Sequence, residues 1–126
     1  MSKSLAERAV VCKHWRWMPG MRAVDGAERF RVSVVSHGYP QGVDEQPPMK
    51  VNVDLGLRWF PDLTDPATLG CLLSLVREAW SDPSLCANDA GHYDLMFWHV
   101  YTGDRNVSVG CQTEAEALVA ALEAAP

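Results

Sequence analysis

Three helix-start motifs divide this chain of 126 residues and fix the order in which its elements can form. Two are capping boxes of the form Ser/Thr-x-x-Glu, in which each side chain binds the backbone amide at the other end of the motif; they begin at Ser4 and Thr113. The third is Asp65 before Pro66, because Asp caps free amides and Pro tolerates the first helical position. The sequence therefore predicts three helices.

The first helix is expected over Ser4–Trp17, and Pro19 with Gly20 ends it. The second is expected to run from Asp65 to Trp80, before Ser81-Asp82-Pro83. Its apolar residues recur at intervals of three and four, which predicts a buried stripe of Leu69, Leu72, Leu73, Val76 and Trp80. The third helix would bury Ala117, Leu118, Ala121 and Leu122.

Period-two alternation of apolar and polar residues predicts strands between these helices. The expected strands are 29–34, 51–58, 95–101 and 106–111, with loops at Ser36–Pro48 and around Asn88, Asp89 and Gly91 and a hairpin turn at 102–105. The order is then α-ββα-ββα. We expect one globular α+β domain over residues 1–126, a mostly antiparallel four-stranded sheet with two to three helices packed on one face.

Charge is distributed unevenly along the chain, which carries 11 basic and 16 acidic side chains, a net charge of -5. Residues 1–32, the basic N-terminal region, hold seven basic and three acidic side chains, so the acidic remainder, 33–126, has a net charge of -9. With 48% hydrophobic residues the chain is expected to fold as a soluble protein. No apolar run approaches the roughly 18 residues of a membrane span, and charges near the start argue against a signal peptide. We expect a cytoplasmic protein without membrane contact, in which Cys12, Cys71, Cys86 and Cys111 stay reduced.

Two segments are candidate binding surfaces. Residues 13–22 interleave basic and aromatic side chains, the pattern of a surface that contacts phosphates and stacks on bases; the candidates are Lys13, Trp15, Arg16, Trp17 and Arg22. The competing interpretation makes the tryptophans core anchors and the cations solvated, and the acidic remainder disfavours a polyanion. The long loop 36–48 offers Tyr39, Asp44 and Glu45 as a second binding surface, or is an insertion without function.

Metal binding and catalysis have weaker signals. Three pairs contain residue types that zinc binds: Cys12 with His14, Cys86 with His92, and His99 with Cys111. None of these pairs has the spacing of a known zinc motif. On a helix, Cys12 and His14 would point about 200° apart. A catalytic site could combine a cysteine nucleophile, Cys86 or Cys111, with a histidine base, His92 or His99. Asp94 would then orient the histidine. The sequence contains no recognised catalytic motif that supports this arrangement. We expect no metal, no cofactor and no enzymatic activity.

Three segments, Cys12–Met21, Pro61–Leu73 and Gly110–Leu118, resemble small uncharacterised proteins found in phages and prophages. They cover about a quarter of the chain and bring no catalytic motif. The resemblance implies a mobile-element origin, and small acidic phage proteins of this kind often bind and inhibit host machinery.

These observations lead to three functional hypotheses. The first is a non-enzymatic phage or prophage protein that binds a host or phage macromolecule in the cytoplasm of the host bacterium. Its most concrete form is an inhibitor of a host defence complex, such as an anti-CRISPR protein acting by protein binding. The alternative is a nucleic-acid-binding accessory protein that uses residues 13–22, and the third is a small enzyme or zinc protein.

Overall fold

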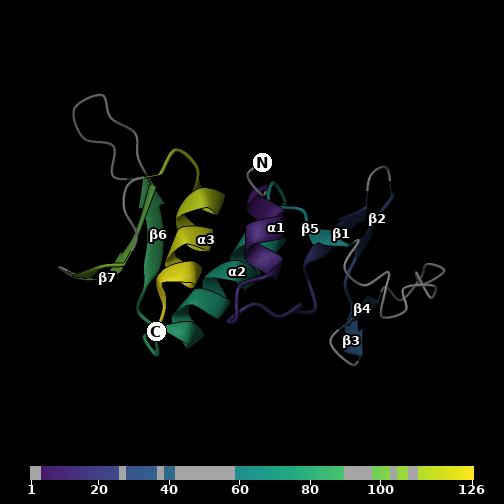
Figure 1. The fold of residues 1–126 in the computed structure, drawn as a ribbon, viewed down its shortest axis with the longest axis horizontal. Coiled ribbons are helices and arrows are strands. Elements are labelled where there is room, and N and C mark those ends of the chain that lie inside the picture. Colours follow the sequence, from purple (N-terminus) through teal and green to yellow (C-terminus); the bar gives the residue numbers. More distant parts are fainter. Residues whose placement is uncertain are drawn as a thin grey trace. The chain divides into compact units, whose positions relative to one another are not determined.

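The computed structural model describes residues 4–25, 28–36, 39–41, 59–89, 98–102, 105–107 and 111–126. It is an α+β structure in which the described residues form three helices and small antiparallel sheets (Figure 1). The elements in chain order are α1 (Leu5–Val10), β1 (Arg22–Asp25), β2 (Glu28–Arg31), β3 (Val34–Ser36), β4 (Tyr39–Gln41), β5 (Phe60–Pro61), α2 (Pro66–Ala79), β6 (Cys86–Asp89), β7 (Trp98–Thr102), β8 (Arg105–Asn106) and α3 (Glu114–Ala124).

The chain divides into two compact units. Unit 1 comprises Met1–Trp15 and Leu72–Pro126, and unit 2 comprises Arg16–Cys71. The boundary falls inside α2, so the first turns of this helix belong to unit 2 and its remainder to unit 1. The single domain expected over residues 1–126 stays a prediction.

Unit 1 packs α3 against the sheet β6-β7-β8, and α1 against α3. Because α3 buries almost every side chain between Ala115 and Leu122, its inner surface is wide and built largely from alanine and leucine. The indole of Trp80, just after α2, donates to the Ala121 carbonyl at 2.8 Å and ties the two helix ends together. Other buried apolar residues of unit 1 lie on α1, α2 and β7, just before β6 and just after α3: Ala9, Leu72, Leu75, Val76, Val100, Leu85 and Ala125.

Unit 2 contains the sheet β2-β1-β5 and the two-stranded sheet β3-β4. The β1–β2 hairpin pairs Ala23 with Phe30, and both side chains are buried. The ring of Phe30 meets Trp59 edge to face, with centroids 4.9 Å apart, a favourable aromatic geometry. Trp17, Met21 and Val32 are also buried in unit 2, and the Val32 amide donates to the Met21 carbonyl at 2.7 Å.

The helix-start motifs are confirmed. Ser4 and Glu7 bind each other's backbone amides at the start of α1, and Thr113 and Glu116 do the same at the start of α3. The Asp65 carboxylate accepts from the amide three residues later at 3.0 Å, which is N-capping of α2 as expected.

The extent of the first helix was predicted wrongly. The prediction ended it at Trp17, whereas α1 ends at Val10. The Cys12 amide turns back to the Ala9 carbonyl, three residues earlier, which tightens the last turn. Tertiary contacts then hold the following residues outside the helix: Cys12 Sγ bonds the Leu122 carbonyl at 3.6 Å, and His14 Nε2 lies 3.0 Å from the Pro126 carbonyl oxygen. The premise that Cys12 and His14 share a helix is therefore wrong.

The second helix matches its prediction closely, but its buried face is rotated. Leu72 and Val76 are buried as expected, whereas Leu69, Leu73 and Trp80 are half-buried. Leu75 and the polar Thr68 are buried without having been expected. All four expected apolar residues of α3 are buried.

The strands agree with the predictions only in part. The described strands form two three-stranded sheets and one two-stranded sheet, and a single four-stranded sheet is not found among them. β1 was not predicted, β3–β4 is a hairpin at the start of the expected loop 36–48, and β6 replaces the loop expected at Asn88 and Asp89. The predicted strand 51–58 and the first part of the strand 95–101 lie outside the described residues.

Candidate functional site

The structure places the basic and aromatic residues of segment 13–22 partly in the core and partly at the surface. Trp17 is buried and Trp15 is half-buried, whereas Lys13 and Arg16 are exposed. A buried indole has no free face on which a base could stack. The boundary between the two units also falls between Trp15 and Arg16, inside the segment. Burial of Trp17 therefore favours its interpretation as a core anchor, and nucleic-acid binding by this segment stays a prediction.

Arg22 lies on β1 and contributes to the structure of unit 2 through its backbone. Its amide donates to the Thr68 hydroxyl oxygen at 2.8 Å, and its side chain is half-buried. The Thr68 hydroxyl in turn donates to the Asp65 carboxylate at 2.8 Å. Thr68 is fully buried, so this chain of hydrogen bonds connects the β1 backbone to the start of α2 away from water.

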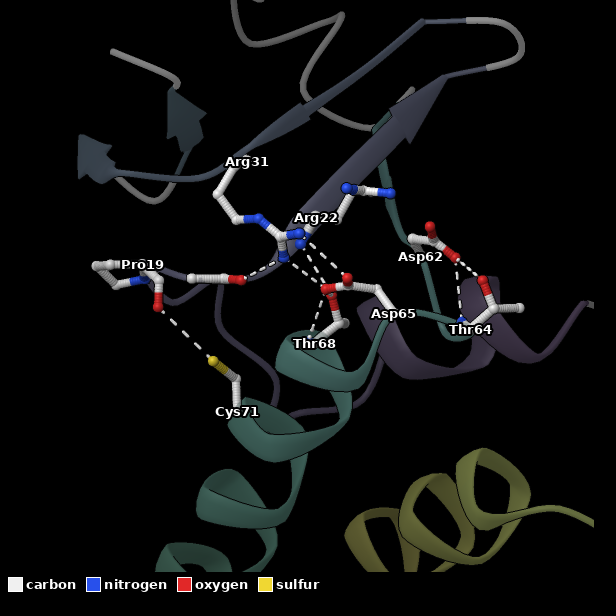
Figure 2. A network of polar contacts seen from close by, with 9 residues as sticks. Pro19, Arg22, Arg31, Asp62, Thr64, Asp65, Thr68 and Cys71 are labelled. Atoms are coloured by element: carbon white, nitrogen blue, oxygen red, sulfur yellow. Dashed lines mark hydrogen bonds and ion pairs between the residues drawn. The ribbon is translucent and has the colours of Figure 1, made fainter.

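A charged pair completes this polar network (Figure 2). Arg31, from the end of β2, binds both oxygens of Asp65, at 2.5 and 3.1 Å, and also donates to the Gly20 carbonyl at 2.8 Å. Such two-pronged pairing of a guanidinium with a carboxylate fixes the angle between the groups as well as their distance. The network therefore holds the hairpin against the first turn of α2.

Electrostatics of the network centre on Asp65, whose side chain is only 8% exposed. Hydrogen bonding from Arg31 is the largest cause that lowers its pKa to about 2, and the Thr68 hydroxyl and amide lower it further, against the raising effect of burial. The same pairing with Asp65 raises the pKa of Arg31. A carboxylate held ionised in this way is a structural anion and a poor general base at neutral pH.

A second cation of the basic N-terminal region is also paired. Arg8 on α1 binds both carboxylate oxygens of Glu123 on α3, at 2.5 and 3.1 Å, and this hydrogen bonding raises the pKa of Arg8. Arg8 and Arg31, both counted among the basic side chains of residues 1–32, thus have carboxylate partners within the protein. The positive charge offered to a ligand is smaller than the sequence indicates.

Several acids of the remainder have local structural roles as well. Asp62 accepts from the amide and hydroxyl of Thr64, and Asp82 does the same for Ser84, so both stabilise turns. Glu116 belongs to the capping box of α3.

The units divide the charge differently from the sequence halves. Unit 1 contains five basic and nine acidic side chains, a net charge of -4, and unit 2 contains six and seven, a net charge of -1. Unit 1 combines residues 1–15 with the C-terminal part of the chain. The basic side chains of residues 1–15 therefore offset only part of the negative charge of residues 72–126. The acidic region is therefore unit 1, and unit 2 is close to neutral.

The sheet register tests the proposed cysteine and histidine pairs. Cys86 lies opposite Tyr101 on β7, so Cys86 and His99 share a face of the sheet, whereas Cys111 bridges to Trp98 and lies on the other face from His99. Burial is the largest cause that raises the pKa of Cys111 and of Cys71, which disfavours the nucleophilic thiolate at both. All four cysteines are free and half-buried.

Among the described residues, no three His, Cys, Asp or Glu side chains gather as metal ligands would. His92 and Asp94, two partners of the catalytic and zinc hypotheses, lie outside that part of the chain. The second candidate surface is equally divided: Tyr39 is on β4, opposite Ser36, and Asp44 and Glu45 lie outside the described residues.

An open hollow of about 560 Å³ lies at the end of α2 in unit 1. Its lining comes from α2 and the turn that follows, with both charge signs present: Ser74, Arg77, Glu78, Ser81, Asp82 and Pro83. Arg77 binds the segment that follows the turn, because its Nε donates to the Leu85 carbonyl at 2.7 Å.

Sequence reasoning missed two features of unit 1: its acidity as a folded unit, and the alignment of Asn88, His99, Tyr101 and Asn106 on one face of its sheet. The alternation of His99 and Tyr101 around Val100 was the available signal for that face. Within the described part of the chain, no helix is long and apolar enough to cross a membrane. Comparisons with protein-family models, with curated proteins and with solved structures found no match to this chain.

Proposed function

We propose that this protein is a non-enzymatic interaction protein of phage or prophage origin that binds a basic protein surface in the cytoplasm of the host bacterium. In its most concrete form it inhibits a host defence complex, such as a CRISPR effector, by occupying a positively charged nucleic-acid channel. Such channels hold nucleic acid through its backbone charge, so a compact acidic protein competes for the same contacts.

The supporting observation is the charge of unit 1, which carries -4 of the chain's net -5. An acidic surface associates faster with a basic surface than with a neutral one, and it disfavours partners that carry negative charge. The same charge repels a polyanion, and the burial of Trp17 removes one of the two tryptophans from the stacking surface that the nucleic-acid alternative needs. The exposed Lys13 and Arg16 are what still favour that alternative.

The test measures binding of the purified protein to purified CRISPR effector complexes, with and without target DNA, over a series of salt concentrations. We expect the affinity to fall steeply as salt rises, because ions screen the exposed charges, and we expect target DNA to compete. Glu78→Gln removes one exposed acid of unit 1, and Asp25→Asn makes the same charge change in unit 2. The unit 1 variant should weaken binding more than its control.

Two results would overturn the proposal. Affinity that is unchanged between low and high salt removes the electrostatic mechanism. Absence of binding to the effectors, together with a gel shift of DNA or RNA oligonucleotides that Lys13→Ala and Arg16→Ala abolish, establishes the nucleic-acid alternative instead.

A further inference from the structure

The sheet of unit 2 buries the side chains of one face. On this buried side, Ala23 on β1 lies opposite Phe30 on β2 and opposite Pro61 on β5, and all three side chains are buried. Successive side chains of a strand alternate between the two faces of a sheet. The chain neighbours of these three residues therefore project from the other face.

The strand register arranges that other face in two rows that cross the sheet. The first row holds a cation, an aliphatic side chain and an aromatic ring, and the second holds two cations and a carboxylate. The last residue of the second row follows β5, and its amide donates to the Arg22 carbonyl at 2.8 Å. We call this surface the arginine face, and its residues, from β2 to β5 in each row, are Arg29, Val24 and Phe60, then Arg31, Arg22 and Asp62.

Two cations of the arginine face are available to a ligand. The described residues include no side-chain partner for Arg22 or for Arg29. Arg29 is exposed and Arg22 is half-buried, and in Figure 2 the Arg22 guanidinium lies apart from the Arg31–Asp65 pair. Asp62 shares the row of Arg22, but one of its carboxylate oxygens accepts two hydrogen bonds from the turn that follows.

The third cation, Arg31, is paired and still has donors to offer. Its guanidinium has five N–H donors, of which three hydrogen bonds to Asp65 and to the Gly20 carbonyl use three. The Arg31 side chain is 43% exposed, so its other donors can reach a ligand. Because Asp65 balances its charge, Arg31 contributes directed hydrogen bonds more than net charge. The pairing also holds the guanidinium in place before a ligand arrives, which lowers the entropy lost on binding.

An aromatic ring belongs to the same face. Phe60 is half-buried, so part of its ring reaches the surface, whereas the neighbouring Trp59 packs against Phe30 on the buried side. Surfaces that hold single-stranded nucleic acid combine cations for the phosphates with aromatic rings on which bases stack. An acidic peptide would use the same cations but would gain little from the ring. The ring is therefore the feature that favours a nucleic acid as the occupant.

We infer that the arginine face binds single-stranded nucleic acid, an activity separate from the proposed contact of unit 1 with a basic protein. Guanidinium groups pair with phosphate through parallel hydrogen bonds, and Phe60 can stack only on a base that is not already stacked in a duplex. The positive charge is local, since unit 2 as a whole has a net charge of -1. We therefore expect modest affinity that falls steeply as salt rises.

The test titrates labelled dT and rU decanucleotides with the full chain at low salt and follows fluorescence anisotropy. Arg29→Glu reverses one charge on the arginine face, and Lys13→Glu makes the same change at an exposed site outside it. Arg29→Glu should weaken binding by roughly tenfold or more relative to this control. Phe60→Leu keeps an apolar side chain without the ring and should weaken binding by roughly fivefold or more. The dT strand should bind more tightly than its duplex with dA.

Each contrary outcome overturns a defined part. Equal weakening by Arg29→Glu and Lys13→Glu removes the arginine face as the site. A glutamate-rich decapeptide that binds in place of the oligonucleotides, with a loss in Arg29→Glu and none in Phe60→Leu, establishes an acidic protein partner instead. Tighter binding of the duplex contradicts the stacking role of Phe60. Absence of oligonucleotide binding at low salt overturns the inference and leaves the proposed contact of unit 1 unaffected.

Discussion

Two arginine–carboxylate pairs, one in each unit, differ in what surrounds the carboxylate. Arg31–Asp65 in unit 2 and Arg8–Glu123 in unit 1 both use two guanidinium nitrogens and both carboxylate oxygens. The two arginines are similarly exposed, at 43% and 41%, but Asp65 is 8% exposed and Glu123 is 38% exposed. Asp65 also caps α2 and accepts from the Thr68 hydroxyl, whereas Glu123 lies at the solvent-facing end of α3.

The comparison shows that the contribution of an arginine–carboxylate pair to stability depends on how deeply the carboxylate is buried. Water and salt screen an exposed pair, which contributes about 0–1 kcal/mol. Removing the partner of a buried, multiply bonded carboxylate leaves several polar groups unsatisfied, which costs much more. The two pairs therefore predict a graded series of stability effects.

The largest effect is expected for Asp65→Ala. This change removes the cap of α2, the partner of Arg31 and an acceptor of Thr68, and should lower the free energy of unfolding by about 2–4 kcal/mol. Urea denaturation followed by circular dichroism measures it. Glu123→Ala is the matched control, and equal losses for the two variants would contradict the contrast between the pairs.

Acid should destabilise the protein through the same carboxylate. The pKa of Asp65 in the folded protein, about 2, lies below its ordinary value of 3.8. Its contribution to stability is therefore present above about pH 4 and is lost as the pH falls from 4 towards 2, by an amount of order 2 kcal/mol. Urea midpoints measured across this range should fall less in Asp65→Asn than in the natural protein. Parallel curves for the two proteins would assign acid sensitivity to other groups.

The Thr68→Val variant should show an intermediate loss in the free energy of unfolding, about 1–2 kcal/mol. Valine has nearly the same shape but no hydroxyl, so the Arg22 amide on β1 loses its acceptor in a buried place. Hydrogen exchange should identify the site, because the Arg22 amide should exchange faster while amides of α3 keep their protection. Unchanged exchange at Arg22 would show that another acceptor replaces the hydroxyl.

The smallest effect is expected for the Arg8–Glu123 pair. A double-mutant cycle with Arg8→Ala and Glu123→Ala should give a coupling energy of about 0.2–1 kcal/mol that fades in high salt. A coupling as large as that of Arg31 with Asp65, measured in the same way, would show that exposure does not set the strength of these pairs.

Helix starts were the part of the fold that sequence predicted best. The capping interactions at Ser4, Asp65 and Thr113 join residues three apart, so the motif contains both partners. Helix ends were less predictable: α1 stops early because the residues after it contact the far end of the chain, at Leu122 and Pro126.

Strands were harder to predict than helix starts, because a strand pairs with residues that are distant in the sequence. Some strands of this protein also contain residues that are uncommon in strands. The sequence signal near β1 is the dipeptide Asp25-Gly26, which is typical of tight turns. The Asn88-Asp89 end of β6 was interpreted as loop because these residues are rare in strands, and pairing with β7 overrides that preference.

The candidate site followed the same division. Residues 13–22 were correctly identified as basic and aromatic, but burial of Trp17 and the unit boundary within the segment depend on the rest of the chain. Which side chains share a face of the β6-β7-β8 sheet depends on the register of three strands, and no spacing within one segment encodes which residues lie opposite each other.

The sequence by itself determined where helices begin, which helix faces are apolar, and that the chain carries an excess of acid. Those properties depend on neighbours within one or two helical turns or on composition alone. Tertiary structure decided which charges are neutralised within the protein, which tryptophans are buried, and which unit is acidic. The physical reason is distance along the chain: Arg31 and Asp65 are 34 residues apart and Arg8 and Glu123 are 115 apart, so only folding brings each pair together.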